Sequence, residues 1–381
     1  MTEDLQTSLA VVGLAIGLCH GVAQCFGFGY SVVLLPSQVS VLDYFPDHFE
    51  IATTIVTLGS GVGMMTLPLL TEQLVVAYSW RGAILILGAL NLHMCVTGLL
   101  MVSAGQQRRV LGEPSTLAIR SQVREDHEET VSLINEHVSV DQHNIDYEGD
   151  DDDDDDADDR NGLGVFYARI ARAAKKVFLD TFDFKIFREC PRFITICMTL
   201  FTYAVSYYGW IVFLIPNAEA KGISPEKAVL LATIGGAGNI FGRLTIGLQA
   251  ARFNLKPQIT YCLICIVSAV AFFYNFFTKS FSILSCLAAM NGFALGGKVM
   301  SSNLLCKDTV SDERFPAALS FLSLVFGIGE TVGALLIGLL YDITKSFDIM
   351  FCVLGAANIL ESCIIISPII KDWMVALVTT R

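Results

Sequence analysis

Long apolar stretches alternate with short polar ones along most of the chain. Nine of them are close to the length of about 20 residues that a helix needs to cross a bilayer; they cover residues 20–42, 50–71, 82–103, 194–216, 228–250, 259–277, 281–305, 316–341 and 349–370. Backbone polar groups in lipid must find partners inside the protein, so each stretch is predicted to be a helix. The sequence lacks the short alternating segments of a membrane β-barrel. The pattern therefore predicts an all-α polytopic membrane protein.

The composition agrees with this prediction. Hydrophobic residues make up 53% of the 381 positions and charged residues 16%, whereas soluble domains usually carry about 25% charged residues. The net charge of −12 is concentrated in one region, where nine aspartates lie between residues 150 and 159. Because the acidity belongs to this one loop, it indicates no nucleic-acid partner.

Lysine and arginine residues predict the orientation of the chain. Twelve of the 25 lie in residues 104–192. If that region is cytoplasmic, 18 basic residues fall inside and five outside, with two more inside spans. Cytoplasmic loops normally carry the excess of basic residues. We therefore expect the central loop, 104–192, and the tail, 372–381, to be cytoplasmic.

The central loop changes character along its length. Up to about residue 162 it is polar and of low complexity, which predicts disorder. Residues 163–184 can form a helix with one apolar face flanked by basic side chains. This segment either lies on the anionic inner leaflet as an amphipathic helix or is a simple basic flank of the next span.

The eleven cysteines lie within the apolar stretches or at their edges. Cys262 and Cys265 form a CxxC pair, but no second pair or nearby histidine completes a zinc site. They are interpreted as small buried hydrophobic residues. No disulfide framework, metal site or cofactor is expected.

An internal repeat divides the chain into two halves. At an offset of 266, five residues of the first half match five of the second: Phe49, Ala52, Leu58, Gly61 and Gly63 fall on Phe315, Ala318, Leu324, Gly327 and Gly329. At an offset of 267, Gly88, Ala89 and Asn91 fall on Gly355, Ala356 and Asn358. Parallel repeats joined by a long cytoplasmic loop are typical of transporters with two six-span halves. The glycines are expected to serve helix packing.

The offset of the internal repeat predicts which spans of the two halves this chain contains. Residues 193–371 form a six-helix C-terminal bundle, and residues 1–103 form an incomplete N-terminal bundle. About 80 residues and two spans of the first half would then lie before position 1. Residues 9–18 would be the stub of a third span; alternatively, residues 8–42 form one long tilted helix.

Several motifs resemble the monocarboxylate transporter family of the major facilitator superfamily, with the N-terminal part truncated. They are "LLPSQVSVLDYF", "YSWRGAILILGALNLHMCVTGLL", "NIFGRLTIGL" and "ERFPAALSFLSLVFGIGETVGALLIGLLYDITKSFDIMF". The resemblance implies transport or symport of a small organic anion, a monocarboxylate, by alternating access in the plasma membrane. An accessory membrane protein is a further candidate partner besides the lipid bilayer. The family's first span has no counterpart here.

Ionisable residues inside spans are costly and usually functional. Arg243 is the first candidate for substrate binding, because its planar fork matches a carboxylate; the alternative is an arginine that reaches the membrane surface. Proton-coupled members of the family have an aspartate at the position of Asn239, which can bind substrate but cannot relay a proton. Lys298 either supplies a second positive charge or pairs internally with Glu330 or Glu361. The remaining candidates are Asn303 for substrate binding and Glu330 as a protonatable group.

Two other classes of function compete with transport. A bundle without its first spans has an incomplete cavity wall, so the chain could be a truncated variant that does not transport, or an interaction protein. An enzyme is not expected, because the spans contain no HExxH motif, paired catalytic aspartates or Ser/His arrangement.

Overall fold

The computed structural model describes residues 37–42, 44–92, 185–253 and 255–379. Most of the expected first span, the stub at residues 9–18, residues 93–103 and the central loop up to residue 184 lie outside these ranges. The acidic run and the basic segment 163–184 are therefore expectations that the structure does not address.

Every described element is helical. After the short helix η1 (Pro46–His48) comes α4 (Phe49–Asn91), and after the central loop the helices are α9 (Lys185–Glu189), α10 (Arg192–Ala220), α11 (Pro225–Arg252), α12 (Pro257–Asn275), α13 (Phe281–Thr309), η2 (Asp312–Arg314), α14 (Phe315–Thr344) and α15 (Phe347–Thr379). Seven of the helices in these ranges are long and apolar enough to cross a membrane. The prediction of an all-helical fold is confirmed for the described residues.

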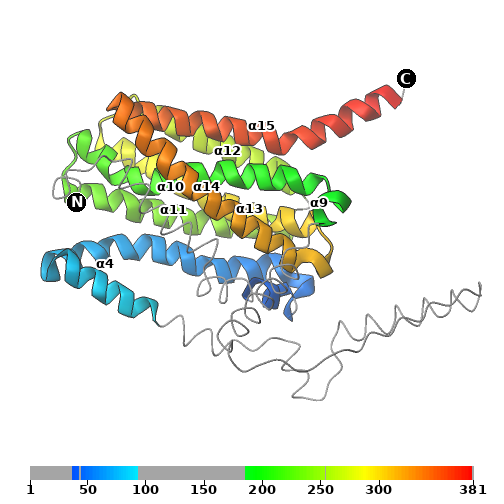
Figure 1. The fold of residues 1–381 in the computed structure, drawn as a ribbon, viewed down its shortest axis with the longest axis horizontal. Helices are drawn as coiled ribbons and strands as arrows, with labels where there is room; N and C mark the ends of the chain where they lie inside the picture. The colour runs from blue at the N-terminus through cyan, green and yellow to red at the C-terminus, as the bar shows by residue number, and fades with distance from the viewer. Residues whose placement is uncertain (1–36, 43, 93–184, 254, 380–381) are drawn as a thin grey trace, which may run out of the picture. The chain divides into compact units, whose positions relative to one another are not determined.

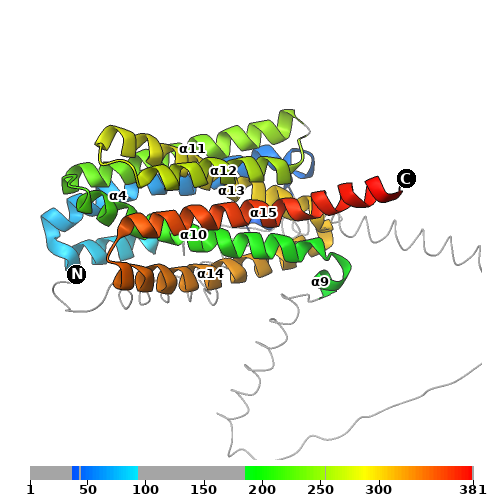
Figure 2. The same ribbon diagram turned by 90° about the horizontal axis from the view of Figure 1, so that it is seen from above.

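Helices α10 to α15 run side by side (Figures 1 and 2). Helix α10 packs against α14 and α15, and α12 packs against α13 and α15. Prolines in the first turns of α11, α12 and α14 help to define where these helices begin. The first N–H groups of a helix have no partner within it, so proline, which has no backbone N–H, loses no hydrogen bond there. The six helices start and end within a few residues of the predicted spans, except that α15 continues through the predicted tail to Thr379.

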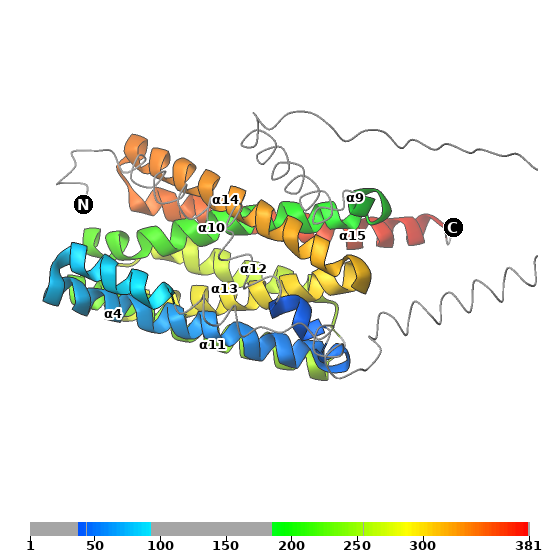
Figure 3. The same ribbon diagram turned by 60° about the horizontal axis from the view of Figure 1, so that its bottom comes forward.

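Helix α4 corrects the prediction for the first half. Residues 50–71 and 82–103 were expected to be two spans with a connection of about ten residues. Instead the chain stays helical up to Tyr78, and the only non-helical residue inside α4 is Ser79, with φ 58° and ψ 174°. Trp80, Arg81 and Gly82 already belong to the helical stretch of α4 that follows Ser79, and Figure 3 shows that α4 is bent. One non-helical residue is enough to connect the two helical stretches, because a positive φ at that residue changes the direction of the chain.

Glycines bring α11 and α13 unusually close together. A Cβ atom added at Gly238 would lie 2.2 Å from the carbonyl oxygen of Ala289, and one at Gly242 would lie 2.1 Å from that of Phe293. From the other side, a Cβ at Gly296 would lie 2.1 Å from the carbonyl oxygen of Asn239. Small residues at such positions let two backbones approach, which is how helices associate in a bilayer.

The opposite side of α11 packs against α4, and the two helices lie side by side in Figure 3. A Cβ at Gly247 would collide with Thr54 at 1.9 Å, and one at Gly236 with the backbone of Met65 at 2.5 Å. Lower-numbered residues of α11 contact higher-numbered residues of α4, so the two helices are antiparallel. Helix α11 is thus held on two sides by contacts that only glycine permits.

This packing makes a prediction about stability. Gly242→Ala should lower the thermal midpoint of the purified protein by several degrees, because overpacking a filled contact costs about 1–3 kcal/mol. The matched control is Gly59→Ala in α4, where a Cβ meets no described atom within 4 Å. The control should leave the midpoint unchanged or slightly raised, since alanine favours helix by about 1 kcal/mol. Equal midpoints for the two variants would contradict the close contact.

Candidate functional site

Arg243 lies inside the helical bundle. Its side chain is buried on α11, with 6% of the residue exposed, and its Nε donates a hydrogen bond of 2.8 Å to Oδ1 of Asn239, one turn earlier. A buried guanidinium needs such partners to offset its desolvation. This position argues against the alternative that Arg243 reaches the membrane surface.

Lys298 on α13 is paired with an acid. Its Nζ lies 2.7 Å from Oε2 of Glu361 on α15, and both side chains are completely buried. Nζ also donates to Oδ1 of Asn358, and the hydroxyl of Tyr261 on α12 donates to the second oxygen of Glu361. Of the two internal partners considered from the sequence, the structure shows Glu361. We call Lys298, Glu361, Asn358 and Tyr261 the ion-pair cluster.

The cluster also reaches α10. The amide nitrogen of Asn358 donates to the carbonyl oxygen of Leu354 at 2.8 Å and to Oγ of Ser206 at 3.4 Å. The amide of Asn358, the hydroxyl of Tyr261 and the ion pair therefore join four helices, α10, α12, α13 and α15. Sequence reasoning missed Asn358 and Tyr261 as members of this group. The repeat match of Asn358 was the only signal that could have pointed to it.

Tyr203 on α10 lies between the candidate residues. It is almost fully buried, and Nζ of Lys298 lies 5.4 Å from the centre of its ring. It is within electrostatic range of Arg243, Glu330 and Glu361. The structure thus brings both predicted cations and both acids into the surroundings of one tyrosine.

Two more aromatic rings border this region. The ring centres of Tyr207 on α10 and Phe326 on α14 lie 5.8 Å and 5.7 Å from that of Tyr203. Glu330 is completely buried one turn beyond Phe326. Asn303 is only half-buried and stands five residues after Lys298, about 140° around α13. The structure therefore does not bring Asn303 to the other predicted residues.

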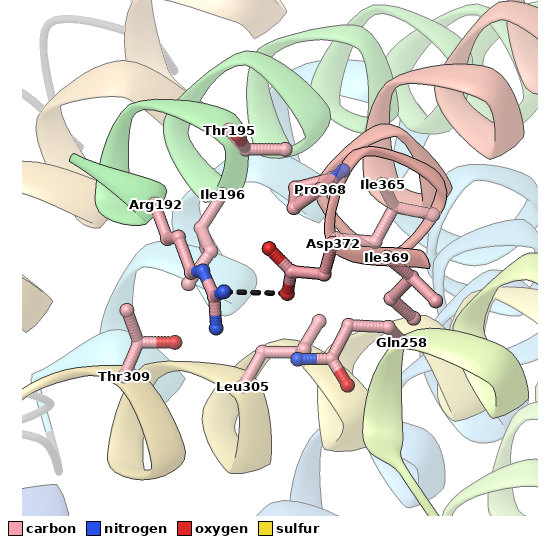
Figure 4. A pocket seen from close by; sticks show the side chains of 10 residues that line it. All are labelled: Arg192, Thr195, Ile196, Gln258, Leu305, Thr309, Ile365, Pro368, Ile369 and Asp372. Atoms are coloured by element: carbon pink, nitrogen blue, oxygen red, sulfur yellow. Dashed lines mark hydrogen bonds and ion pairs between the residues drawn. The ribbon is translucent and has the colours of Figure 1, made fainter. Parts of the chain in front are cut away.

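A separate small cavity lies at the ends of α10, α12, α13 and α15 (Figure 4). Its volume is about 40 Å³, enough for a few water molecules. Arg192 and Asp372 form an ion pair of 2.6 Å there; the other lining residues are Thr195, Ile196, Gln258, Leu305, Thr309, Ile365, Pro368 and Ile369. None of the predicted site residues lines it.

Comparison with known proteins identifies the family. A family model described as Major Facilitator Superfamily matches residues 5–274 and also residues 193–368. The chain belongs to the major facilitator superfamily. The resemblance noted from the sequence motifs is thereby confirmed at the level of the superfamily, and the chain is a multi-pass membrane protein.

The similar curated proteins are monocarboxylate transporters by name. Monocarboxylate transporter 12 of Mus musculus is 25% identical over 94% of this chain and 66% of its own length. Monocarboxylate transporter 6 of Mus musculus is 25% identical over 90% of the chain and 64% of its own length. Monocarboxylate transporter 2 of Rattus norvegicus is 23% identical over 86% and 59%. The chain thus spans somewhat less than two thirds of the length of these relatives.

The ion-pair cluster predicts an effect of Tyr261 on stability. Tyr261→Phe removes the hydroxyl that donates to Glu361 and leaves one oxygen of a buried carboxylate without that donor. The expected loss in unfolding free energy is about 1–3 kcal/mol, measured by thermal or denaturant unfolding of the purified protein. Tyr274→Phe is the control, because Tyr274 lies on the same helix with 50% of its surface exposed. A loss equal to that of the control would show that the hydroxyl contributes nothing.

Proposed function

We propose that this protein transports a small organic anion, a monocarboxylate, by alternating access, and that Arg243 binds the carboxylate. The observation that carries the proposal is the burial of Arg243 inside the bundle, where its guanidinium is held by Asn239. The names of the similar proteins support the substrate class. They describe transporters and not enzymes, and they give no support to the alternative of an interaction protein without transport.

The geometry suits the binding of a monovalent anion. A guanidinium keeps its charge throughout the accessible pH range, and its rigid fork can donate two parallel hydrogen bonds to one carboxylate. The bond from Nε to Asn239 fixes the plane of that fork. Because the surroundings are of low dielectric, the attraction is stronger than at a surface. Asn239 thus acts as a positioning residue for Arg243 in this proposal.

Alternating access requires contacts that close one end of the protein. Phe49 at the start of α4 and Phe315 at the start of α14 pack edge to face, with ring centres 5.6 Å apart. These two residues are equivalent in the internal repeat. Nζ of Lys307 lies 4.4 Å from the ring centre of Phe49 and 3.3 Å from the carbonyl oxygen of Pro46. We propose that this group, the phenylalanine gate, closes the end that faces the cytoplasm in the predicted orientation.

Other parts of the proposal rest on the sequence. Glu330 is proposed as a protonatable group of the site, and its complete burial near Tyr203 is compatible with that role. A plasma-membrane location with a cytoplasmic central loop and C-terminus follows the distribution of basic residues. Asn303 as a binding residue and an accessory membrane protein as a partner stay predictions.

The proposal predicts that Arg243 is required for uptake. In cells or proteoliposomes, Arg243→Ala should reduce uptake of a labelled monocarboxylate at least about 20-fold, because hydrogen bonds to charged groups contribute about 1.5–3 kcal/mol each. Compared with Arg243→Ala, Arg243→Lys should recover only part of the uptake. Lysine keeps the positive charge but cannot donate two parallel hydrogen bonds as the planar guanidinium does.

The matched control is Arg252→Ala, at the exposed end of the same helix. This variant should transport like the wild type when uptake is normalised to protein at the membrane. Equal uptake by wild type and Arg243→Ala would remove Arg243 from the mechanism.

The phenylalanine gate predicts that a covalent link across it stops transport. In the double variant Phe49→Cys/Phe315→Cys, a short bifunctional thiol reagent should abolish uptake, because the two ends could no longer separate. The chain has eleven native cysteines, so the wild type and each single variant receive the same reagent as controls. Unchanged uptake in a double variant shown to be cross-linked would contradict the gate.

A further inference from the structure

Helix α15 is longer than the helix beside it. It has 33 residues, or about 50 Å at 1.5 Å per residue, whereas its neighbour α12 has 19 residues. A bilayer with its headgroup regions is about 40–45 Å thick. In Figures 1 and 2 the last part of α15 runs beyond the ends of the other coloured helices, and Figure 1 shows that it is bent. Pro368 lies inside α15, and proline is a common cause of such a bend.

The small cavity of Figure 4 shows where the neighbouring helices end. Gln258 at the start of α12 and Thr309 at the end of α13 line it together with Ile365 and Ile369 of α15. Helices α12 and α13 therefore end at the level of these two isoleucines. About ten residues of α15, 370–379, extend past this level, which is about 15 Å along the helix axis.

One face of this extension is apolar and exposed. Trp373 and Met374 are 63% and 52% exposed, and Ile370 is exposed as well. Because Trp373 and Met374 follow Ile370 by three and four residues, the three side chains share one face of the helix. Towards the middle of α15, Ile359 and Cys363 are exposed on the same face. The face that the span turns to lipid therefore continues into the extension.

The opposite face is polar and tied to the bundle. Asp372 follows Ile370 and precedes Met374 by two residues, so it lies about 160–200° around the helix from both. Its Oδ2 lies 2.6 Å from Nη2 of Arg192 at the start of α10 (Figure 4). An exposed ion pair contributes little stability, but this one sets the rotation of the helix. With Asp372 turned towards α10, the apolar face points away from the bundle.

A membrane surface is the partner that fits this face. The extension starts where the neighbouring helices end and continues the lipid-facing side of a span. The nearest apolar medium is therefore the boundary between headgroups and acyl chains, where amphipathic helices lie. Tryptophan is enriched at this depth, which suits Trp373. Lys371 is exposed beside the apolar face, and a long lysine side chain can reach headgroup phosphates from there.

We propose that residues 370–379 are a membrane-surface anchor: α15 bends at Pro368 and inserts Trp373 and Met374 into the headgroup boundary of the leaflet on that side. In the predicted orientation this is the cytoplasmic leaflet. The ion pair between Arg192 and Asp372 keeps the polar face turned to the protein. This inference does not depend on the transported solute.

The test measures the depth of Trp373 in lipid. The chain has three tryptophans, and the difference in fluorescence between Trp80→Phe and Trp80→Phe/Trp373→Phe is the signal of Trp373 alone. Trp210 is buried and stays the same in both variants. The purified full chain is placed in phosphatidylcholine vesicles that carry bromine either near the headgroup or near the end of the acyl chains. Bromine near the headgroup should quench the Trp373 signal at least about twofold more strongly, because tryptophan prefers the interface.

Two exposed positions supply a matched pair of variants. In the Trp80→Phe background, Met374→Gln places an amide on the apolar face and should reduce quenching of Trp373 by bromine near the headgroup. Lys371→Gln places the same amide outside that face and should leave the quenching unchanged. Both side chains are exposed, so neither substitution disturbs the packed interior. Equal quenching in the two variants would overturn the assignment of the apolar face.

The other outcomes also decide the matter. Stronger quenching by bromine near the chain ends would mean that Trp373 lies in the hydrocarbon as part of an ordinary span, and the anchor would be wrong. Absence of quenching by either lipid would place Trp373 in water or against protein, such as a second copy of this chain, and would overturn the proposal. Because no transport is measured, none of these results bears on the proposed function.

Discussion

The close approach of α11 and α13 is the constraint on which the rest of the interior depends. Carbonyl oxygens of one helix lie where the Cβ atoms of the other would be at Gly238, Gly242 and Gly296, so the register of the two helices has little freedom. Because this contact fixes the level of the next residues along each chain, it sets the height in the bundle at which Arg243 and Lys298 lie. Packing, rather than any attraction between charges, decides where the two cations lie.

Once the two cations are buried, their partners follow from electrostatics. A charge without water must be neutralised or hydrogen-bonded by the protein, and Glu361, Asn358 and Asn239 meet this requirement. Lys298 is matched by a full negative charge, and Nε of Arg243 donates to the neutral amide of Asn239. The planar guanidinium of Arg243, which can donate two parallel hydrogen bonds to a carboxylate, makes Arg243 the better candidate for binding an anion.

The sequence predicted those features of the fold that depend on the spacing and length of the apolar stretches. The helices from α10 to α15 and the burial of Arg243 agree with expectation, since apolar length and intramembrane charge are visible residue by residue. The one-residue break at Ser79 was not predicted, because polar residues between two apolar stretches do not reveal whether they are helical. The choice of Glu361 over Glu330 for Lys298 also could not be made, because it depends on which faces of α13, α14 and α15 meet. Asn303 shows the same limit, since it shares a helix with Lys298 but not a face.

The ion-pair cluster raises the question of why charges are kept there at all. A buried pair usually contributes little net stability over apolar side chains of similar size, because desolvation offsets the attraction. Methionine and leucine could therefore join α13 to α15 as well as Lys298 and Glu361 do. Charged side chains do differ from apolar ones in one respect, since they need partners in a defined hydrogen-bond geometry. The ion pair and its bonds to Asn358 and Tyr261 therefore define how α12, α13 and α15 meet more strictly than an apolar contact would.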